Sequence, residues 1–98
     1  MGERIVIISL GIRLYASNSL KDKRRVRQKL AMRLKDRFNI SIKETGNLEM
    51  LNYLSLTAAH VAIDAREGER FIASFRDEAE AILLGEGELV RYDVDMIN

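Results

Sequence analysis

Residues 4–38 have the sequence RIVIISLGIRLYASNSLKDKRRVRQKLAMRLKDRF. Aliphatic side chains dominate residues 4–14, which predicts a central strand with one fully buried face. That face consists of Val6, Ile8, Leu10, Ile12 and Leu14. The hydroxyl of Ser19 can then accept a hydrogen bond from the amide of Asp22, so a capped helix is predicted to run to about Phe38. The helix has an apolar stripe of Leu20, Val26, Leu30, Ala31, Leu34 and Phe38.

The remainder of the chain is predicted to contain two strands, a second helix and a last strand. Alternating residues predict a short strand over 40–45 and a longer one over 53–64. Asp64 can cap a second helix, which Gly85 ends, and residues 88–97 alternate as a last strand. For the last strand we predict one face of Val90, Tyr92, Val94 and Met96, and an opposite face of Arg91, Asp93 and Asp95.

The predicted order βαββαβ favours an α+β protein with the ferredoxin-like split βαβ fold. Right-handed crossovers place both helices on one face of a four-stranded antiparallel sheet and leave the other face uncovered. A chain of 98 residues is the size of one domain, so we expect residues 1–98 to form a single ferredoxin-like domain.

Composition excludes several functional classes. The chain contains no cysteine, which rules out disulfides, thiolate metal sites and cysteine nucleophiles. His60 is the only histidine, and its position in the alternating pattern predicts that it faces the helices. Residues 14–20 lack the glycines of an acylphosphatase-like anion loop. We therefore predict no catalytic residue, no metal site, no cofactor and no small-molecule substrate.

The cellular location follows from the same features. The longest apolar run is too short to span a bilayer, and the N-terminal residues do not have the pattern of a secretory signal. Hydrophobic residues make up 47% and charged residues 32% of the chain, a balance typical of soluble globular proteins. We expect a cytoplasmic protein without a membrane partner.

The net charge of +1 conceals a strongly uneven distribution. Residues 1–45 contain twelve Lys or Arg and four acids, whereas residues 64–98 contain four Lys or Arg and ten acids. Nine of the sixteen cations lie in the predicted first helix, between Lys21 and Arg37. A basic region of this kind concentrates phosphates.

The spacing of these cations opposes helix stability. Lys21, Arg25, Lys29 and Arg33 form one row at i, i+4, where each like-charge pair costs about 0.2–0.5 kcal/mol, and the first turn lies at the positive end of the helix dipole. We interpret the row as a phosphate-binding surface for RNA. The predicted RNA-binding residues are Lys21, Arg24, Arg25, Lys29 and Arg33. The alternative is a solvated face that the acids of residues 67–80 neutralise.

Two further helix cations fall at the border of the apolar stripe. The stems of Lys23 and Arg27 are expected to lie along the sheet with their charges reaching out to water. We predict that Arg27 contributes to packing more than to ligand contact.

The uncovered sheet face offers a second candidate surface. Tyr53 is the only aromatic residue expected on its two central strands, so base stacking of the kind used by ferredoxin-like RNA readers is not predicted. Ile5, Ile7, Ala59 and Val61 instead form an apolar patch, which is typical of partner or self-association surfaces. The alternative is an ordinary exposed face with a few aliphatic residues.

Three segments resemble a known family: Ser19-Leu-Lys-Asp-Lys-Arg-Arg-Val26, Arg37-Phe38-Asn39 and Asp64-Ala-Arg66. The chain resembles the YlxP-like family, a bacterial group of unknown function. The resemblance implies a ferredoxin-like fold and no established activity. It also implies a ribosome-linked role, because members often lie beside genes for ribosome maturation. Arg27 and His60 stand where the family pattern has aliphatic residues.

These observations predict a non-enzymatic module that binds RNA or a ribosomal particle through its basic first helix. The alternative function is protein interaction or homodimerisation through the apolar patch on the open sheet face.

Overall fold

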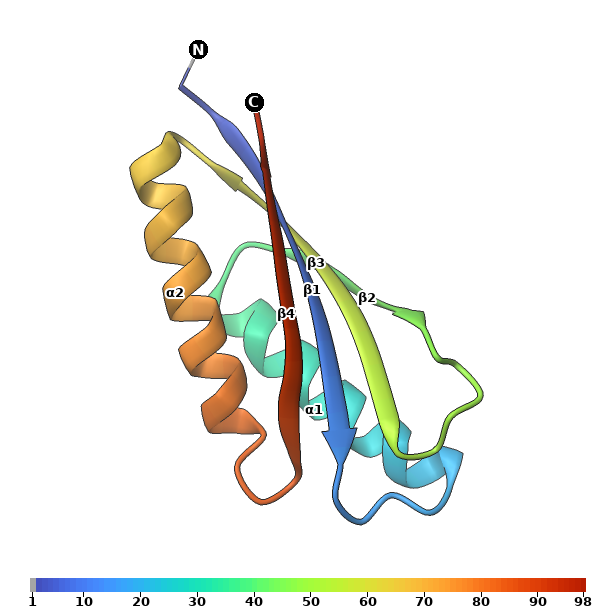
Figure 1. The fold of residues 1–98 in the computed structure, drawn as a ribbon. Helices are drawn as coiled ribbons and strands as arrows, with labels where there is room; N and C mark the ends of the chain where they lie inside the picture. Colours follow the sequence, from blue (N-terminus) through green and yellow to red (C-terminus); the bar gives the residue numbers. More distant parts are fainter. Residues whose placement is uncertain (1) are drawn as a thin grey trace.

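A computed structural model describes residues 2–98 and contains six elements in the predicted order βαββαβ. They are β1 (Arg4–Leu14), α1 (Leu20–Arg37), β2 (Ser41–Gly46), β3 (Tyr53–Ala62), α2 (Ala65–Ile82) and β4 (Gly87–Ile97). The strands form one antiparallel sheet in the order β2-β3-β1-β4. Both helices lie on the same side of this sheet (Figure 1). The predicted ferredoxin-like α+β fold is confirmed.

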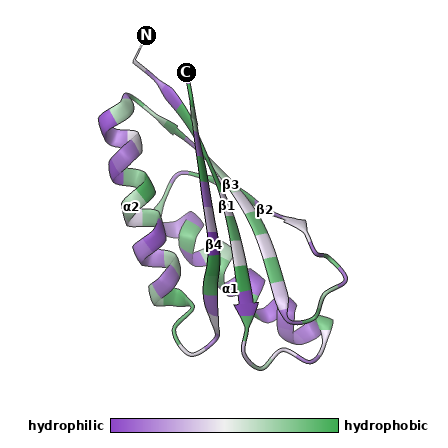
Figure 2. Ribbon diagram, viewed as in Figure 1, coloured by the Kyte–Doolittle hydropathy of each residue, from purple (hydrophilic) through white to green (hydrophobic). Residues whose placement is uncertain are grey.

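The core lies between the helices and the sheet. The buried face of β1 is the predicted one, and Val6, Ile8, Leu10 and Ile12 are fully inaccessible to water. Hydrophobic and polar residues alternate along β3 (Figure 2), as a strand with one covered face requires. An aromatic cluster closes one end of the core, where Phe38 lies edge-on to Phe71 with ring centroids 5.4 Å apart.

Both predicted helix caps are present. The Ser19 hydroxyl accepts a hydrogen bond from the amide of Asp22 at 3.1 Å, and the Asp64 carboxylate accepts one from the amide of Glu67 at 2.8 Å. Each bond satisfies an amide that has no partner inside the helix. Beyond the end of α2, Gly85 adopts a φ of +80°, a left-handed conformation that glycine adopts without steric cost.

A bulge in β4 corrects one predicted face. Gly11 pairs with Arg91, but the next residue, Ile12, pairs with Leu89, so Val90 is an extra residue in the ladder. The prediction that Val90 shares a face with Tyr92 is therefore wrong. Leu89 packs against the core, while Val90 is 44% exposed. An inserted residue reverses which side chains face the core on its N-terminal side, and the alternation of residues in the sequence does not reveal the insertion.

His60 lies on the helix-facing side of β3, as predicted. Its ring stacks on Phe71 with centroids 3.9 Å apart, and its Nδ1 lies 2.8 Å from the carbonyl oxygen of Asn39. Its Nε2 lies 3.5 Å from a carboxylate oxygen of Glu67. The residue therefore packs at the edge of the core.

Candidate nucleic-acid interface

The orientation of α1 is set by its buried residues. Val26, Leu30 and Leu34 recur at spacings of four and face the sheet. The opposite side of the helix faces solvent and carries most of the basic residues of α1. We refer to Lys21, Arg24, Arg25, Lys29 and Arg33 as the α1 basic face.

An acid outside α2 holds two members of this face. Arg25 donates two hydrogen bonds to the carboxylate of Glu86, at 3.0 and 3.2 Å, and Lys29 donates a third at 3.0 Å. Hydrogen bonds from Arg25 and then Lys29 lower the pKa of Glu86 from 4.5 to about 2. Glu86 lies between α2 and β4, outside the 67–80 segment in which the sequence offered neutralising acids.

The other three members remain available. Lys21, Arg24 and Arg33 are exposed, and none of them makes an ion pair with any other residue between 2 and 98. Twelve residues separate Lys21 from Arg33, which corresponds to about 18 Å along the helix axis. Lys35 is also exposed and has no acidic partner within the described part of the chain, and the sequence interpretation had not included it.

The N-terminus of α1 has a different character. The carboxylate of Asp22 accepts a hydrogen bond from the backbone amide of Asn18 at 3.1 Å. Asp22 and Glu86 both line the small hollow between this turn and the α2–β4 connection. These carboxylates disfavour a phosphate at the backbone amides of this first turn, so the candidate interface consists of the exposed side chains of α1 and not of its N-terminal amides.

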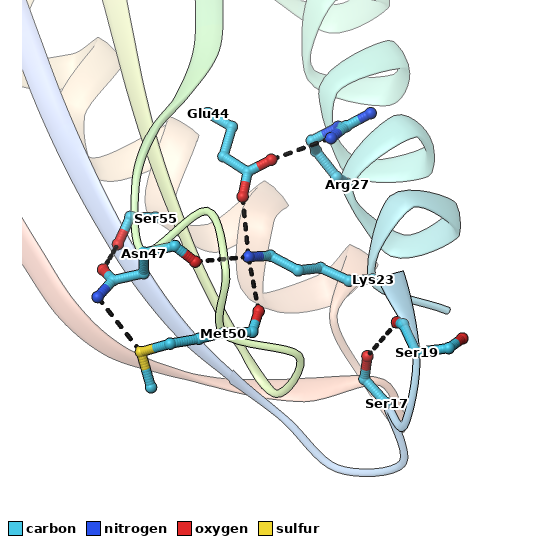
Figure 3. A network of polar contacts seen from close by, with 8 residues as sticks. All are labelled: Ser17, Ser19, Lys23, Arg27, Glu44, Asn47, Met50 and Ser55. Atoms are coloured by element: carbon cyan, nitrogen blue, oxygen red, sulfur yellow. Dashed lines mark hydrogen bonds and ion pairs between the residues drawn. The ribbon is translucent and has the colours of Figure 1, made fainter. Parts of the chain in front are cut away.

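Lys23 corrects another prediction. Its side chain is buried, with 2% of the residue exposed, and its ammonium lies 2.8 Å from the carbonyl oxygens of both Asn47 and Met50 (Figure 3). The ammonium also lies 2.9 Å from a carboxylate oxygen of Glu44. The expectation that this charge reaches water is wrong, because the β2–β3 loop folds over it and supplies the oxygen atoms.

Arg27 joins the same cluster from the next turn of α1. Its guanidinium lies 2.9 Å from the second carboxylate oxygen of Glu44. Burial raises the pKa of Glu44, but the ion pairs with Lys23 and Arg27 outweigh burial and leave that pKa below its usual value. We refer to Lys23, Arg27, Glu44 and the carbonyls of Asn47 and Met50 as the Lys23 cluster. It ties the β2–β3 loop to α1.

The loop that this cluster holds exposes apolar side chains beside the α1 basic face. Leu48, Met50 and Leu51 are exposed in the loop, and Leu20 is exposed at the start of the helix. Leu20 and Leu48 share a shallow hollow with Arg24. Sequence reasoning missed this neighbourhood, because a residue's place in a loop does not reveal which helix the loop contacts.

The predicted apolar patch is present on the open sheet face. Ile5 pairs with Val61 and Ile7 pairs with Ala59, so the four residues are contiguous on adjacent strands. Ile5 is 46% exposed and Val61 is 68% exposed. Ile97 pairs with Ile5 from the other side and extends the patch, which the sequence interpretation had not included.

The described residues were also compared with the requirements of a metal site and of a membrane-spanning helix. Between residues 2 and 98, no group of three or more His, Asp or Glu side chains could hold a metal ion. Neither helix in this range is long and apolar enough to cross a membrane.

Comparison with family models identifies the chain. A model described as protein of unknown function (DUF503) matches residues 5–95. The chain belongs to the DUF503 family. No curated protein matches the sequence. Membership in DUF503 is consistent with the fold but assigns no activity.

Solved structures show the same fold at low identity. A dimeric ferredoxin-like protein of unknown function from Thermobifida fusca is 18% identical and has a TM-score of 0.53, with 99% of this chain and 92% of that chain covered. A designed protein, Foldit4, is 12% identical with a TM-score of 0.53, covering 98% and 97%. A hydantoinase/carbamoylase family amidase from Burkholderia ambifaria has a TM-score of 0.60 at 10% identity, and this chain spans only 28% of it.

Proposed function

We propose that this DUF503 protein is a non-enzymatic module that binds structured RNA, as in a ribosomal particle, through the α1 basic face. The observation that carries the proposal is the exposure of Lys21, Arg24 and Arg33, which have no acidic partner in residues 2–98. Unpaired cations on one rigid helix are suited to phosphate contacts, which position a protein on nucleic acid without reading its sequence.

The ion pairs of Glu86 distinguish two groups among the five cations. Arg25 and Lys29 share one carboxylate, so the three groups together retain a single positive charge. Lys21, Arg24 and Arg33 are the direct phosphate ligands in this proposal. Arg25 and Lys29 contribute to the field around them and to the attachment of α1 to the α2–β4 connection.

The loop beside the helix supports this interpretation. Leu20 and Leu48 lie next to Arg24 and offer apolar contact area close to the cationic one. The α1 basic face therefore has a few exposed apolar atoms beside its charged groups.

Binding of a fluorescent structured RNA and of purified ribosomal subunits, measured at about 50 and 200 mM salt, tests the proposal. Arg24→Glu/Arg33→Glu is expected to abolish most binding and to reduce the log-log salt slope by about 1.4–1.8, since each phosphate contact contributes about 0.7–0.9.

A matched control exists on the second helix. Arg66→Glu/Arg70→Glu changes the net charge by the same amount at two exposed positions of α2 that make no ion pair with residues 2–98. The control is expected to bind almost as well as the wild type. Equal losses in both variants would show that only net charge matters, and the α1 basic face would then not be the site.

A further inference from the structure

The open face of the sheet has an ordered arrangement of charge and apolar residues. Neighbouring strands place side chains in rows that run across the sheet. One row consists of Lys43 on β2, Thr57 on β3, Ser9 on β1 and Asp93 on β4. Its two ends carry opposite charges, and the apolar patch lies in the next two rows toward the chain termini. Figure 1 shows the four strands that carry these rows, with both helices on the far side.

We propose that this face binds a second copy of the chain, with the two-fold axis parallel to the strands. Rotation about such an axis turns one sheet over onto the other and exchanges its edges. The β2 edge of one copy then lies over the β4 edge of the other. Each row remains opposite the same row, which is the isologous arrangement of a symmetric dimer.

Charge complementarity supports this axis. Lys43 of one copy lies over Asp93 of the second copy, and the same contact repeats on the other side of the axis. Lys43 is exposed and has no acidic partner in the described residues, whereas Asp93 is exposed and accepts a hydrogen bond from Arg91 at 2.8 Å. Asp95, one row away on β4, is exposed and adds a second negative charge near the same ammonium.

The apolar patch matches itself under the same rotation. Val61 lies over Ile5 of the second copy, and Ala59 lies over Ile7, so the most exposed aliphatic residue of the face becomes covered. At the opposite end of the sheet, Tyr53 lies over Arg13 of the second copy. Arg13 also forms an ion pair with Glu88 on its own sheet.

An axis perpendicular to the strands is disfavoured by the same rows. An axis centred on the row of Lys43 and Asp93 would place Lys43 over Lys43 of the second copy and Asp93 over Asp93 of the second copy. It would also place Ile5 over Arg13. Like charges facing each other across an interface oppose association, so when the row of Lys43 and Asp93 lies at the centre of the interface, the strand-parallel axis is favoured.

The size of the face agrees with a modest dimer. β1, β3 and β4 extend over at least ten residues and β2 over six. These lengths give about 570 Å² per copy, or about 1,100 Å² buried over both copies, which is above the roughly 1,000 Å² expected of a specific interface. The α1 basic face lies on the helical side of the sheet and remains exposed. The inference therefore stands independently of the proposed function.

Sedimentation velocity over a concentration series of the full chain tests the proposal. The wild type is expected to form a dimer, and Lys43→Asp or Asp93→Lys alone is expected to raise the dimer Kd by about tenfold or more. The combined variant Lys43→Asp/Asp93→Lys restores the opposite charges across the axis and is expected to recover most of the affinity.

This recovery cannot come from within one molecule. Lys43 and Asp93 are three strand spacings apart on the same sheet, about 14 Å. Lys35→Asp on the exposed side of α1 serves as the control for net charge and is expected to leave the Kd unchanged. A monomeric wild type, single reversals without effect, or a double variant no better than either single one would each overturn the proposed interface.

Discussion

Replacing Lys23 with Met tests whether the Lys23 cluster stabilises the fold. The substitution keeps an apolar stem but removes the ammonium, which lies 2.8 Å from two carbonyl oxygens and 2.9 Å from Glu44. The carbonyls of Asn47 and Met50 then lose a donor, and Glu44 retains only Arg27. Removing one partner of a buried ion pair costs about 3–5 kcal/mol when no water replaces it.

Two features of the structure reduce this expected loss of unfolding free energy. The Arg27 side chain is only partly buried and continues to neutralise Glu44, and the β2–β3 loop lies at the surface, where water can reach the freed carbonyls. We expect the free energy of unfolding to fall by about 2–3 kcal/mol. A domain of this size has about 5–15 kcal/mol in total, so the loss is large enough to measure.

Urea unfolding followed by circular dichroism provides the assay. With a denaturant slope of about 1–2 kcal/mol/M, the midpoint is expected to decrease by about 1–3 M with an unchanged slope. Lys21→Met, two residues away and exposed, is the matched control and is expected to change stability by less than about 0.5 kcal/mol.

A double-mutant cycle with Glu44→Gln isolates the ion pair from the loop contacts. The coupling between Lys23 and Glu44 is expected to be about 1–2 kcal/mol, as for residues in direct contact. The reasoning is refuted if Lys23→Met is no more destabilising than Lys21→Met, because the ammonium would then be solvated in the native state and the cluster would contribute nothing.

Three further substitutions have defined outcomes. Glu86→Gln is expected to lower the free energy of unfolding by about 1–2 kcal/mol after solvent screening. Because the pKa of Glu86 is lowered from 4.5 to about 2, this contribution is present above pH 4.5 and is lost as the pH falls toward 2. Unfolding curves of the wild type and the variant over a pH series measure it. The same variant frees two cations of the α1 basic face, so its RNA affinity should rise. Gly11→Ala places a methyl group against the Tyr53 hydroxyl and should cost about 1–3 kcal/mol in thermal unfolding, with partial recovery in Gly11→Ala/Tyr53→Ala. Tyr92→Phe removes the 2.7 Å hydrogen bond to the Ile72 carbonyl, which should lower the free energy of unfolding by about 1 kcal/mol. Burial raises the pKa of Tyr92 above 10, so the stability of the wild type falls as the pH rises above 10. The variant should lack this part of the decrease.

Local sequence signals determined most of the fold. Alternating aliphatic residues fixed the strand of residues 4–14, and the side-chain acceptors Ser19 and Asp64 fixed where both helices begin. These signals act within one strand or one helical turn, so they are legible without knowledge of distant contacts. The order of the elements then allowed only a few topologies, and right-handed crossovers selected the observed one.

The functional surfaces depended on tertiary structure. The sequence placed four cations in one i, i+4 row of α1, but only the folded chain brings Glu86, 57 residues beyond Lys29, onto two of them. The same holds for Lys23, whose partners come from a loop more than twenty residues away. The bulge at Val90 likewise depends on pairing with β1. Helix and strand periodicity is encoded by neighbours in the sequence, whereas ionic partners and sheet register are encoded by contacts between segments far apart in the chain, and only the packed structure defines those contacts.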